Sequence, residues 1–448
     1  MSWVSQTELR AAFARVLSTM YGGEVPAYTT LVDVAQEVNA EVLAREGSAA
    51  ERLGSLDRVT AERHGAIRVG SPAELAQVGR LFAAMGMHPV GCYDLRDAEP
   101  APLPVVSTAF RPVDRDELAS NPFRVFTSML VPEDRRFFDA DLQARVQRFI
   151  GARTLFPPAL LELADRSVSD YGLSPADSGR FLDLATSAFA LSPEPIDQPW
   201  YDELSAVSGV AADIAGVTTT HVNHLTPRVL DIDELYDRMQ ARGIEMIDEI
   251  QGPPQWDGPD VLLRQTSFRA LAEPRVMRAA DGSVAPGELR VRFGEVEARG
   301  IALTPAGRDA VDPLPPEPAA WAAAIPDTER ELARAGLAWF TAAVSSGAAD
   351  LAAAGRRPPD DVPALVDDGW VSLDPVVYED FLPRSAAGIF RSNLAGDGAA
   401  DATVAGVERD AAWLAGALGR DLHDPMDLYA AEVDASWARV RADLGVAT

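Results

Sequence analysis

One order of predicted elements occurs twice along this chain, namely a strand, a helix and then three strands. In the first copy, a strand over 64–70 is followed by Ser71-Pro72-Ala73-Glu74, which is the residue pattern of a helix N-terminus. The helix should end at Gly86, and strand-like runs follow near 88–95, 104–111 and 123–131. This alternation predicts an α+β fold with a mixed sheet.

The second copy is faint as a sequence repeat, but its elements come in the same order. A strand is predicted over 221–229 and a helix over 231–242, which ends at Gly243. Strand-like runs follow near 244–251, 260–269 and 288–300. The chain is therefore expected to contain two related modules.

The segments around the two modules have helical periodicity. Helices are predicted over 6–22 and 29–63, over 135–215 with breaks at Pro157-Pro158 and near 193–199, and over 327–346, 405–419 and 426–443. We expect one compact unit with five parts. These are an N-terminal helical segment (1–63), the first module (64–134), a helical insertion (135–215), the second module (216–303), and a linker with a mostly helical C-terminal segment (304–448).

Rare residue types narrow the possible chemistry. All 40 basic residues among the 448 are arginines, which excludes lysine Schiff bases and the lysine of a phosphate-binding loop. The single cysteine, Cys92, excludes cysteine-rich zinc sites and iron–sulfur clusters, and it favours a cytoplasmic location. The five histidines are His64, His88, His221, His224 and His423. A metal or acid–base site must be drawn from these and from carboxylates.

The formal net charge of −28 indicates a strongly acidic surface. Such a surface repels phosphate backbones and anionic lipids, so neither a nucleic acid nor a membrane is expected as a partner. No apolar run approaches the length of about 18 residues expected of a membrane span, and the N-terminus lacks a secretory pattern. An anionic substrate would need a local basic clamp. The oligomeric state is not predicted.

His64 and Arg68 are four residues apart on the first predicted strand. They would therefore share a face and lie roughly 13 Å apart. An extended dicarboxylate could reach from a metal at His64 to the guanidinium of Arg68, whose fork takes a carboxylate in two parallel hydrogen bonds. The alternative is a capping or surface histidine beside an unrelated surface arginine.

The motif His221-Val-Asn-His224 offers two histidines in the second module. Along a regular strand both cannot face one metal, because side chains alternate. We favour His224, since it precedes the helix cap Asp231 much as His64 precedes its own helix. His221 would then support the site from outside, and the alternative is that neither binds metal.

Glu295 and Glu297 lie on the last predicted strand of the second module, on one face together with Phe293. A carboxylate beside an aromatic side chain is a candidate for a buried functional acid. The alternative is a solvated edge strand in which the glutamates pair with Arg292 and Arg299.

Two histidines and one carboxylate form the facial triad of non-haem Fe(II) oxygenases, which leaves positions open for substrate and dioxygen. We therefore predict that His64, His224 and one of the two glutamates, Glu295 or Glu297, hold Fe(II). His88 and His423 are interpreted as turn or core residues.

Five unusual segments are spread over nearly the whole chain. They are 62–70 (Glu-Arg-His-Gly-Ala-Ile-Arg-Val-Gly), 221–228 (His-Val-Asn-His-Leu-Thr-Pro-Arg), 263–268 (Leu-Arg-Gln-Thr-Ser-Phe), 293–297 (Phe-Gly-Glu-Val-Glu) and 378–383 (Tyr-Glu-Asp-Phe-Leu-Pro). Together they resemble the 2-oxoadipate dioxygenase/decarboxylase family, also called 2-hydroxyglutarate synthases. The resemblance implies that the two modules form a core similar to the vicinal-oxygen-chelate proteins.

The resemblance also implies roles for single residues. The metal ligands would be His64, His224 and Glu295, and Arg68 would contact the substrate. A further substrate contact would lie directly after Phe-Leu-Pro, where this chain has Arg384 in place of the valine of another member. A backbone contact there would be little affected by the change, whereas a side-chain contact would affect the preferred chain length of the substrate.

The implied reaction converts 2-oxoadipate and O₂ into 2-hydroxyglutarate and CO₂, in lysine catabolism. Decarboxylation and hydroxylation take place on the same molecule, so no separate cosubstrate is needed. One alternative is another metal enzyme of the same architecture, such as an isomerase or a ring-cleaving dioxygenase, that acts on a different acid. Another is a ligand-sequestering protein that needs no metal.

Overall fold

The centre of the molecule is a five-stranded mixed sheet, seen in a computed structural model that describes residues 3–98, 102–393, 400 and 403–446. Its order is β3 (His88–Asp94), β4 (Val105–Arg111), β5 (Arg124–Leu130), β2 (Arg63–Val69) and β8 (His224–Pro227). β2 runs parallel to β5 and antiparallel to β8. The fold is therefore mixed α+β, as predicted.

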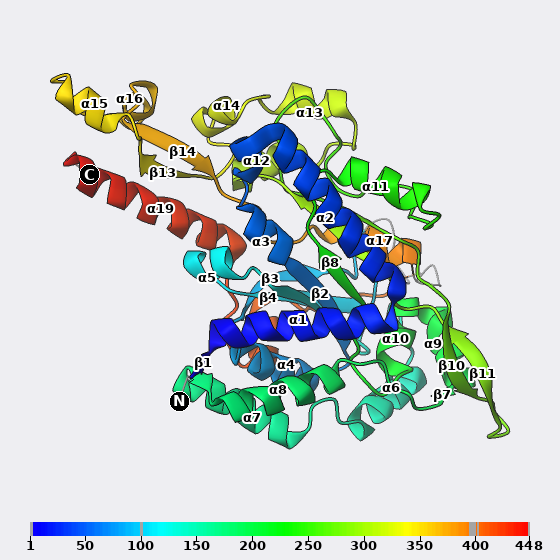
Figure 1. Cartoon of the computed structure of the whole chain (residues 1–448). Coiled ribbons are helices and arrows are strands. Elements are labelled where there is room, and N and C mark those ends of the chain that lie inside the picture. Colours follow the sequence, from blue (N-terminus) through cyan, green and yellow to red (C-terminus); the bar gives the residue numbers. More distant parts are fainter. Residues whose placement is uncertain (1–2, 99–101, 394–399, 401–402, 447–448) are drawn as a thin grey trace.

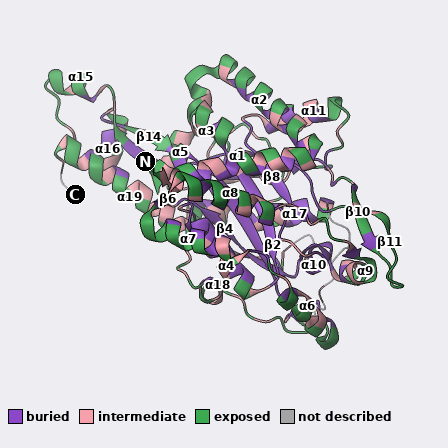
Figure 2. Ribbon diagram, turned by 60° about the horizontal axis from the view of Figure 1, so that its bottom comes forward, coloured by how far each residue is buried: buried purple, intermediate pink, exposed green. Residues whose placement is uncertain are grey.

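β2 is an interior strand that is buried from His64 to Val69. Its apolar residues Ile67 and Val69 belong to the main hydrophobic core. Because a polar group without a partner is costly in such a place, the polar side chains of β2 need partners inside the protein. Figure 2 shows the central strands in the colour of buried residues and the helices around them largely exposed on their outer sides.

The first module has the predicted order of elements. After β2, helix α4 (Pro72–Ala83) begins at Ser71, whose side chain accepts a hydrogen bond from the Glu74 backbone N–H. The turn after α4 uses Gly86 with φ +66°. The structure adds one short helix, α5 (Arg115–Ser120), between β4 and β5.

The second module departs from the prediction in its strands. Helix α11 (Ile232–Ala241) follows β8 and is capped by Asp231, and β9 (Leu263–Ser267) pairs antiparallel with β12 (Glu295–Arg299). The predicted strand over 244–251 is wrong, because this segment makes only two isolated bridges, Met246 with Phe268 and Gln251 with Gln265 of β9. Its acidic residues 248–249 are exposed.

The predicted strand over 288–300 is also wrong in its extent, since residues 290–294 form no strand. A hairpin that was not predicted, β10 (Glu273–Arg278) and β11 (Val284–Leu289), pairs with the two-residue strand β7 (Ile196–Asp197). β11 is largely exposed and lacks the apolar alternation of a half-buried strand, which explains the omission.

Helices from the N-terminal segment and the insertion surround the sheet, and α1 crosses in front of it in Figure 1. They are α1 (Gln6–Glu24), α2 (Pro26–Glu46), η1 (Gly47–Glu51), α3 (Leu56–Ala61), α6 (Ala140–Ala152), α7 (Pro158–Asp170), α8 (Pro175–Ala188), α9 (Gln198–Val207) and α10 (Gly209–Ala215). The small strands β1 (Val4–Ser5) and β6 (Gly172–Leu173) pair with each other. The single helix predicted over 29–63 is wrong, because Gly47 with φ +59° ends α2.

The C-terminal segment holds two strands where the sequence predicted helix or no regular structure. The helix predicted over 327–346 is wrong, because Gly336 with φ +66° follows α14 (Glu329–Arg334) and the chain continues as β13 (Phe340–Val344). β13 pairs with β14 (Val371–Pro375). The aromatic and β-branched residues in β13 favour this strand over the alanine-rich helical pattern around it.

The remaining helices are α12 (Pro305–Val311), α13 (Pro318–Ala324), α15 (Ala348–Ala353), α16 (Val362–Asp367), α17 (Pro383–Asn393), α18 (Ala411–Leu418) and α19 (Pro425–Leu444). α19 confirms the helix predicted over 426–443, whereas only the second half of 405–419 is helical. Among the described residues, no helix has the length and apolar character that crossing a membrane requires.

Candidate metal centre

The structure brings His64, His224 and Glu295 together, with one ligand atom of each within 4.8 Å of the other two. His64 lies on β2, and His224 begins β8, the antiparallel neighbour of β2. Glu295 begins β12, which is held beside β8 by the hydrogen bond from Val229 N–H to the Glu297 carbonyl (2.8 Å). Glu295 Oε1 lies 3.6 Å from His64 Nε2, and its Oε2 lies 3.2 Å from His224 Nε2.

The three side chains are almost completely buried, with exposed fractions of 1%, 3% and 3%. Burial lowers the pKa of His64, although Glu297 opposes this effect, and burial together with His64 holds the pKa of His224 well below its usual value. Burial and the neighbouring Glu297 raise the pKa of Glu295 well above its usual value. Neutral imidazoles are the form that binds a metal, and a divalent cation between them would favour the ionised Glu295.

Polar neighbours orient the three candidate ligands. Glu297 Oε2 lies 2.8 Å from His64 Nδ1, which leaves the Nε2 of His64 facing Glu295. The side-chain amide of Gln265 donates a hydrogen bond to Glu295. Burial opposes ionisation of Glu297, but Arg299 and His64 lower its pKa to about 2. Such contacts fix the tautomer and direction of metal-binding side chains.

Glu297 belongs to a buried network of ion pairs behind the ligands. Arg124 Nη1 lies 2.6 Å from Glu62 and 3.4 Å from Glu297, and it also contacts Glu379 through Nη2. Burial opposes ionisation of Glu62, but Arg124 and its neighbouring arginines hold the pKa of Glu62 well below its usual value. The network fixes the position of Glu297 and, through it, of His64.

Aromatic rings cover the two histidines. The Phe381 ring lies 5.0 Å from the His64 ring at an angle of 88°, and the Phe293 ring lies 5.0 Å from the His224 ring. These contacts surround the polar centre with apolar surface and limit the access of water.

Arg68 is buried on β2 with an exposed fraction of 3%. Its Nη1 forms an ion pair with Asp213 of α10, and its guanidinium lies 4.9 Å from the ring centre of Phe390 on α17. After burial and His64, the charge of Arg68 also contributes to the lowered pKa of His224.

The other predicted residues lie apart from the cluster of ligand atoms. The Arg384 side chain is exposed and lines a separate pocket of about 390 Å³ with Leu382 and Trp321, so its contact with substrate stays a prediction. His221 Nε2 lies 3.0 Å from Asp213 and does not join the three ligand atoms. The rings of His88 and His423 contact each other at 5.8 Å, and neither residue belongs to the group of candidate ligands.

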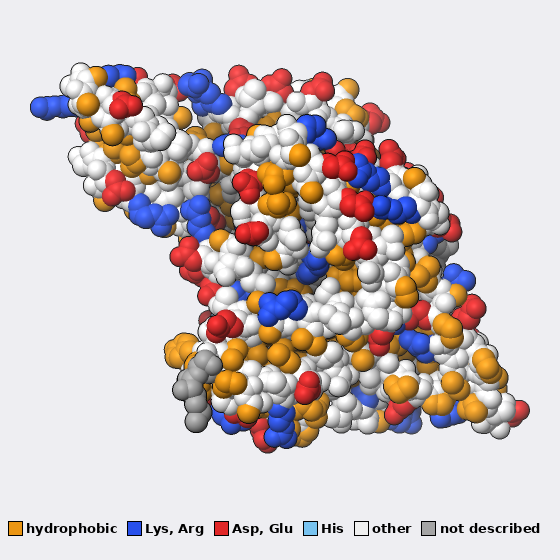
Figure 3. All heavy atoms as spheres, viewed as in Figure 1, with side chains coloured by type: hydrophobic (Ala, Val, Ile, Leu, Met, Phe, Trp, Pro, Cys, Tyr) orange, Lys and Arg blue, Asp and Glu red, His pale blue; other side chains and the backbone are white. Residues whose placement is uncertain are grey.

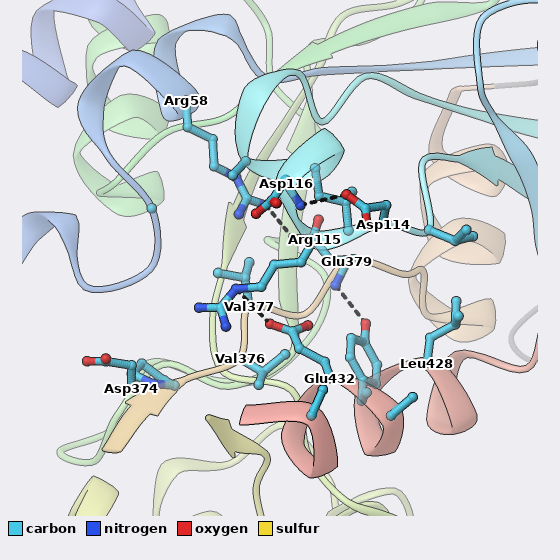
Figure 4. A pocket seen from close by; sticks show the side chains of 18 of the residues that line it. Arg58, Asp114, Arg115, Asp116, Asp374, Val376, Val377, Glu379, Leu428 and Glu432 are labelled. Atoms are coloured by element: carbon cyan, nitrogen blue, oxygen red, sulfur yellow. Dashed lines mark hydrogen bonds and ion pairs between the residues drawn. The ribbon is translucent and has the colours of Figure 1, made fainter. Parts of the chain in front are cut away.

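A larger pocket of about 910 Å³ lies between α5, the segment 374–379 and α19, and Figure 4 shows Arg58, Glu379 and Glu432 in its wall. Its lining includes none of the predicted site residues. Glu379 joins it to the buried network through Arg124.

Comparisons with known proteins identify the family of the chain. A family model described as 2-oxoadipate dioxygenase/decarboxylase matches residues 13–393. The chain belongs to this family. A 2-oxoadipate dioxygenase/decarboxylase of Mycobacterium tuberculosis is 60% identical over 434 residues, covering 94% of this chain and 95% of the relative. One of Pseudomonas putida is 40% identical over 453 residues, covering 96% and 95%.

A solved family member has the same overall fold. The hydroxyglutarate synthase of Pseudomonas putida, in complex with 2-oxoadipate, superposes with a TM-score of 0.85 at 37% identity and covers 100% of both chains. This chain is accordingly an enzyme of the 2-oxoadipate dioxygenase/decarboxylase family.

Two residues that contact the candidate site directly, Gln265 and Asp213, were not predicted from the sequence. Gln265 lies in one of the five family-like segments, but a single amide on a strand gives no sign of its target. Asp213 lies in a helical segment that was treated as scaffold. Only its position a few residues before His221 could have drawn attention to it.

Proposed function

We propose that this chain is an Fe(II)-dependent dioxygenase that converts 2-oxoadipate and O₂ into 2-hydroxyglutarate and CO₂. The observation that carries the proposal is the buried cluster of His64, His224 and Glu295, whose ligand atoms lie within 4.8 Å of one another. The names of the relatives and the 2-oxoadipate complex of the Pseudomonas putida protein support the choice of substrate.

The donor set fits Fe(II). Two imidazoles and one carboxylate are a common Fe(II) set that leaves coordination positions free. Burial and Glu297 raise the pKa of Glu295, and the charge of Arg299 only partly opposes this effect. A bound cation would compensate the charge of this carboxylate. When bound, Fe(II) supplies the redox chemistry that couples dioxygen to the 2-oxo acid.

The remaining residues would bind and orient the substrate. The 2-oxo acid end would lie at the metal ligands, and the distal carboxylate would reach Arg68 four residues along β2. Phe381 and Phe293 would keep water from the reacting end. The substrate contact proposed for Arg384 rests on the family resemblance alone, because its exposed side chain lines a separate pocket.

The reaction balances without a second organic substrate. One oxygen atom of O₂ enters the new carboxylate as CO₂ leaves, and the other becomes the hydroxyl group on the adjacent carbon. The same proposal includes a vicinal-oxygen-chelate relation between the two modules and the five-part division of the chain. It also includes a place in lysine catabolism and a cytoplasmic location. The arrangement of β2-α4 and β8-α11 supports the relation of the modules.

A stoichiometry experiment tests the activity. Iron-loaded protein is mixed with 2-oxoadipate, and O₂ uptake, CO₂ release and 2-hydroxyglutarate are measured together. We expect a ratio of one to one to one, with no turnover when O₂ is removed. Conversion without O₂ uptake, or turnover only of a different 2-oxo acid, would contradict the proposal and favour another metal enzyme of this architecture.

A further inference from the structure

The guanidinium of Arg68 is unusual among the buried arginines that the structure describes. Both Nε and Nη2 of Arg68 are buried and have no hydrogen-bond partner, and no other arginine in the described ranges leaves this pair of atoms buried and unpaired. These two groups point in parallel along one edge of the guanidinium, so they can hold both oxygens of one carboxylate.

Elsewhere in the molecule, this same edge is occupied by a carboxylate. Arg111 donates from Nε and Nη2 to the two oxygens of Asp380 at 3.0 and 3.2 Å. Arg299 does so to Glu297 at 2.7 and 2.8 Å, and Arg153 does so to Glu74 at 2.8 and 2.9 Å. The unpaired edge of Arg68 therefore has the donor geometry with which these other arginines bind a carboxylate.

Asp213 holds the other side of Arg68. It is buried near the end of α10 and forms an ion pair with Arg68 Nη1. The same carboxylate lies 3.0 Å from His221 Nε2 and accepts a 2.7 Å hydrogen bond from Asn223 Nδ2. Burial opposes its ionisation, but His221 and Arg68 together hold the pKa of Asp213 below its usual value.

Other contacts restrict Arg68 further. Its backbone carbonyl accepts a 2.6 Å hydrogen bond from the Thr220 hydroxyl, and the Phe390 ring covers its guanidinium. With Nη1 held by Asp213 and one face covered by Phe390, the Nε and Nη2 edge remains for a ligand.

We propose that Asp213, supported by His221 and Asn223, is a positioning residue that turns the free Nε and Nη2 edge of Arg68 toward the distal carboxylate of the substrate. This inference rests on the proposed function. It assigns the selection of a 2-oxo dicarboxylate over a monocarboxylate to the insertion helix α10, which contributes none of the three candidate metal ligands. His221 and Asn223 both contact Asp213, so the inference also explains why these two residues lie beside His224.

The test compares two acids of equal chain length in Asp213→Asn. 2-Oxoadipate carries the distal carboxylate, and 2-oxohexanoate has a methyl group in its place. The Asn side chain keeps the shape but removes the charged acceptor, so Arg68 is no longer held in one orientation. We expect KM for 2-oxoadipate to rise about tenfold or more, while kcat and the kcat/KM for 2-oxohexanoate change less than about threefold.

A matched control separates positioning from stability. Asp134 is also buried and paired with two arginines, Arg96 and Arg136, but contacts none of the site residues. Asp134→Asn should leave the preference between the two acids unchanged, even if it lowers Tm. A purely structural role of Asp213 would reduce the active fraction equally for both acids and leave the ratio of their kcat/KM values unchanged.

The outcomes are distinct. If Asp213→Asn keeps the preference for 2-oxoadipate, the inference is overturned while the proposed function stands. The same holds if the native enzyme uses both acids equally well. A native enzyme that does not turn over 2-oxoadipate would overturn the proposed function and the inference with it. If Asp213→Asn does not fold, His221→Gln decides by the same ratio, with a fall in preference expected and an unchanged preference contradicting the inference.

Discussion

At the scale of single residues, Glu297 determines which nitrogen of His64 is available to a metal. Its carboxylate lies 2.8 Å from Nδ1 and is itself held by Arg299 through two hydrogen bonds of 2.7 and 2.8 Å. With a pKa of about 2, Glu297 stays charged at all working pH values. It therefore fixes the tautomer of His64 and strengthens Nε2 as a ligand.

Glu297→Gln should weaken iron binding without abolishing it. The amide can still contact His64 but loses the negative charge, and affinity should fall by about 10- to 100-fold. The measurement is anaerobic titration with Fe(II). Glu273→Gln serves as control, because Glu273 also pairs with a buried arginine, Arg292, away from the ligands. Equal affinities of the two variants would contradict the assigned role of Glu297.

The sequence predicted some of these residues and not others for a physical reason. Side chains alternate along a strand, so Glu295 and Glu297 could be assigned to one face, and both indeed contact His64. The position of His224 before Asp231 already favoured it over His221, and the resemblance added the choice of Glu295 over Glu297. The contact between Arg68 and Asp213 spans 145 positions along the chain, and no local pattern specifies such a contact.

At the scale of elements, the segment 244–252 supports the strand that carries Gln265. Gln251 exchanges backbone hydrogen bonds of 2.7 and 2.9 Å with Gln265, and Gly252 follows with φ +104°. A Cβ added at Gly252 would lie 2.2 Å from the backbone oxygen of Leu263 on β9. This close approach explains how an irregular segment can hold β9 in place without forming a strand.

Gly252→Ala should therefore destabilise the protein strongly, by about 3 kcal/mol or more, because positive φ and a backbone overlap add together. Gly243→Ala is the matched control, since Gly243 also has positive φ, +77°, but has open space around it. That variant should cost about 1 kcal/mol. Urea unfolding of both variants measures the difference, and equal losses of unfolding free energy would show that the contact with β9 is unimportant.

Elements with strong local patterns were predicted from sequence, whereas elements that depend on partners were not. Helix α4 has a serine cap, a proline in its first turn and buried apolar residues at helical spacing, and it was predicted closely. β13 was predicted as helix because alanine and leucine surround it, and its pairing with β14 lies in a distant part of the chain. Tertiary pairing overrides local preference in such cases.

At the scale of the whole molecule, the chain buries many arginines together with carboxylates, although its net charge is −28. Figure 3 shows acidic and basic side chains interspersed over one face, with no uniform patch. Among the largest fully buried side chains are five arginines: Arg10, Arg111, Arg124, Arg228 and Arg292. The sequence indicated that an anionic substrate would need a local basic clamp, and Arg68, buried near the candidate ligands, could provide it.

The central claim is that His64, His224 and Glu295 hold one Fe(II) ion, and equilibrium iron binding under anaerobic conditions tests it most directly. The native chain should bind one Fe(II), and replacing any of the three by alanine should weaken binding by about 100-fold or more. The matched controls His88→Ala and His423→Ala should bind as the native chain does. Undiminished iron binding in the variants of His64, His224 or Glu295 would contradict the account.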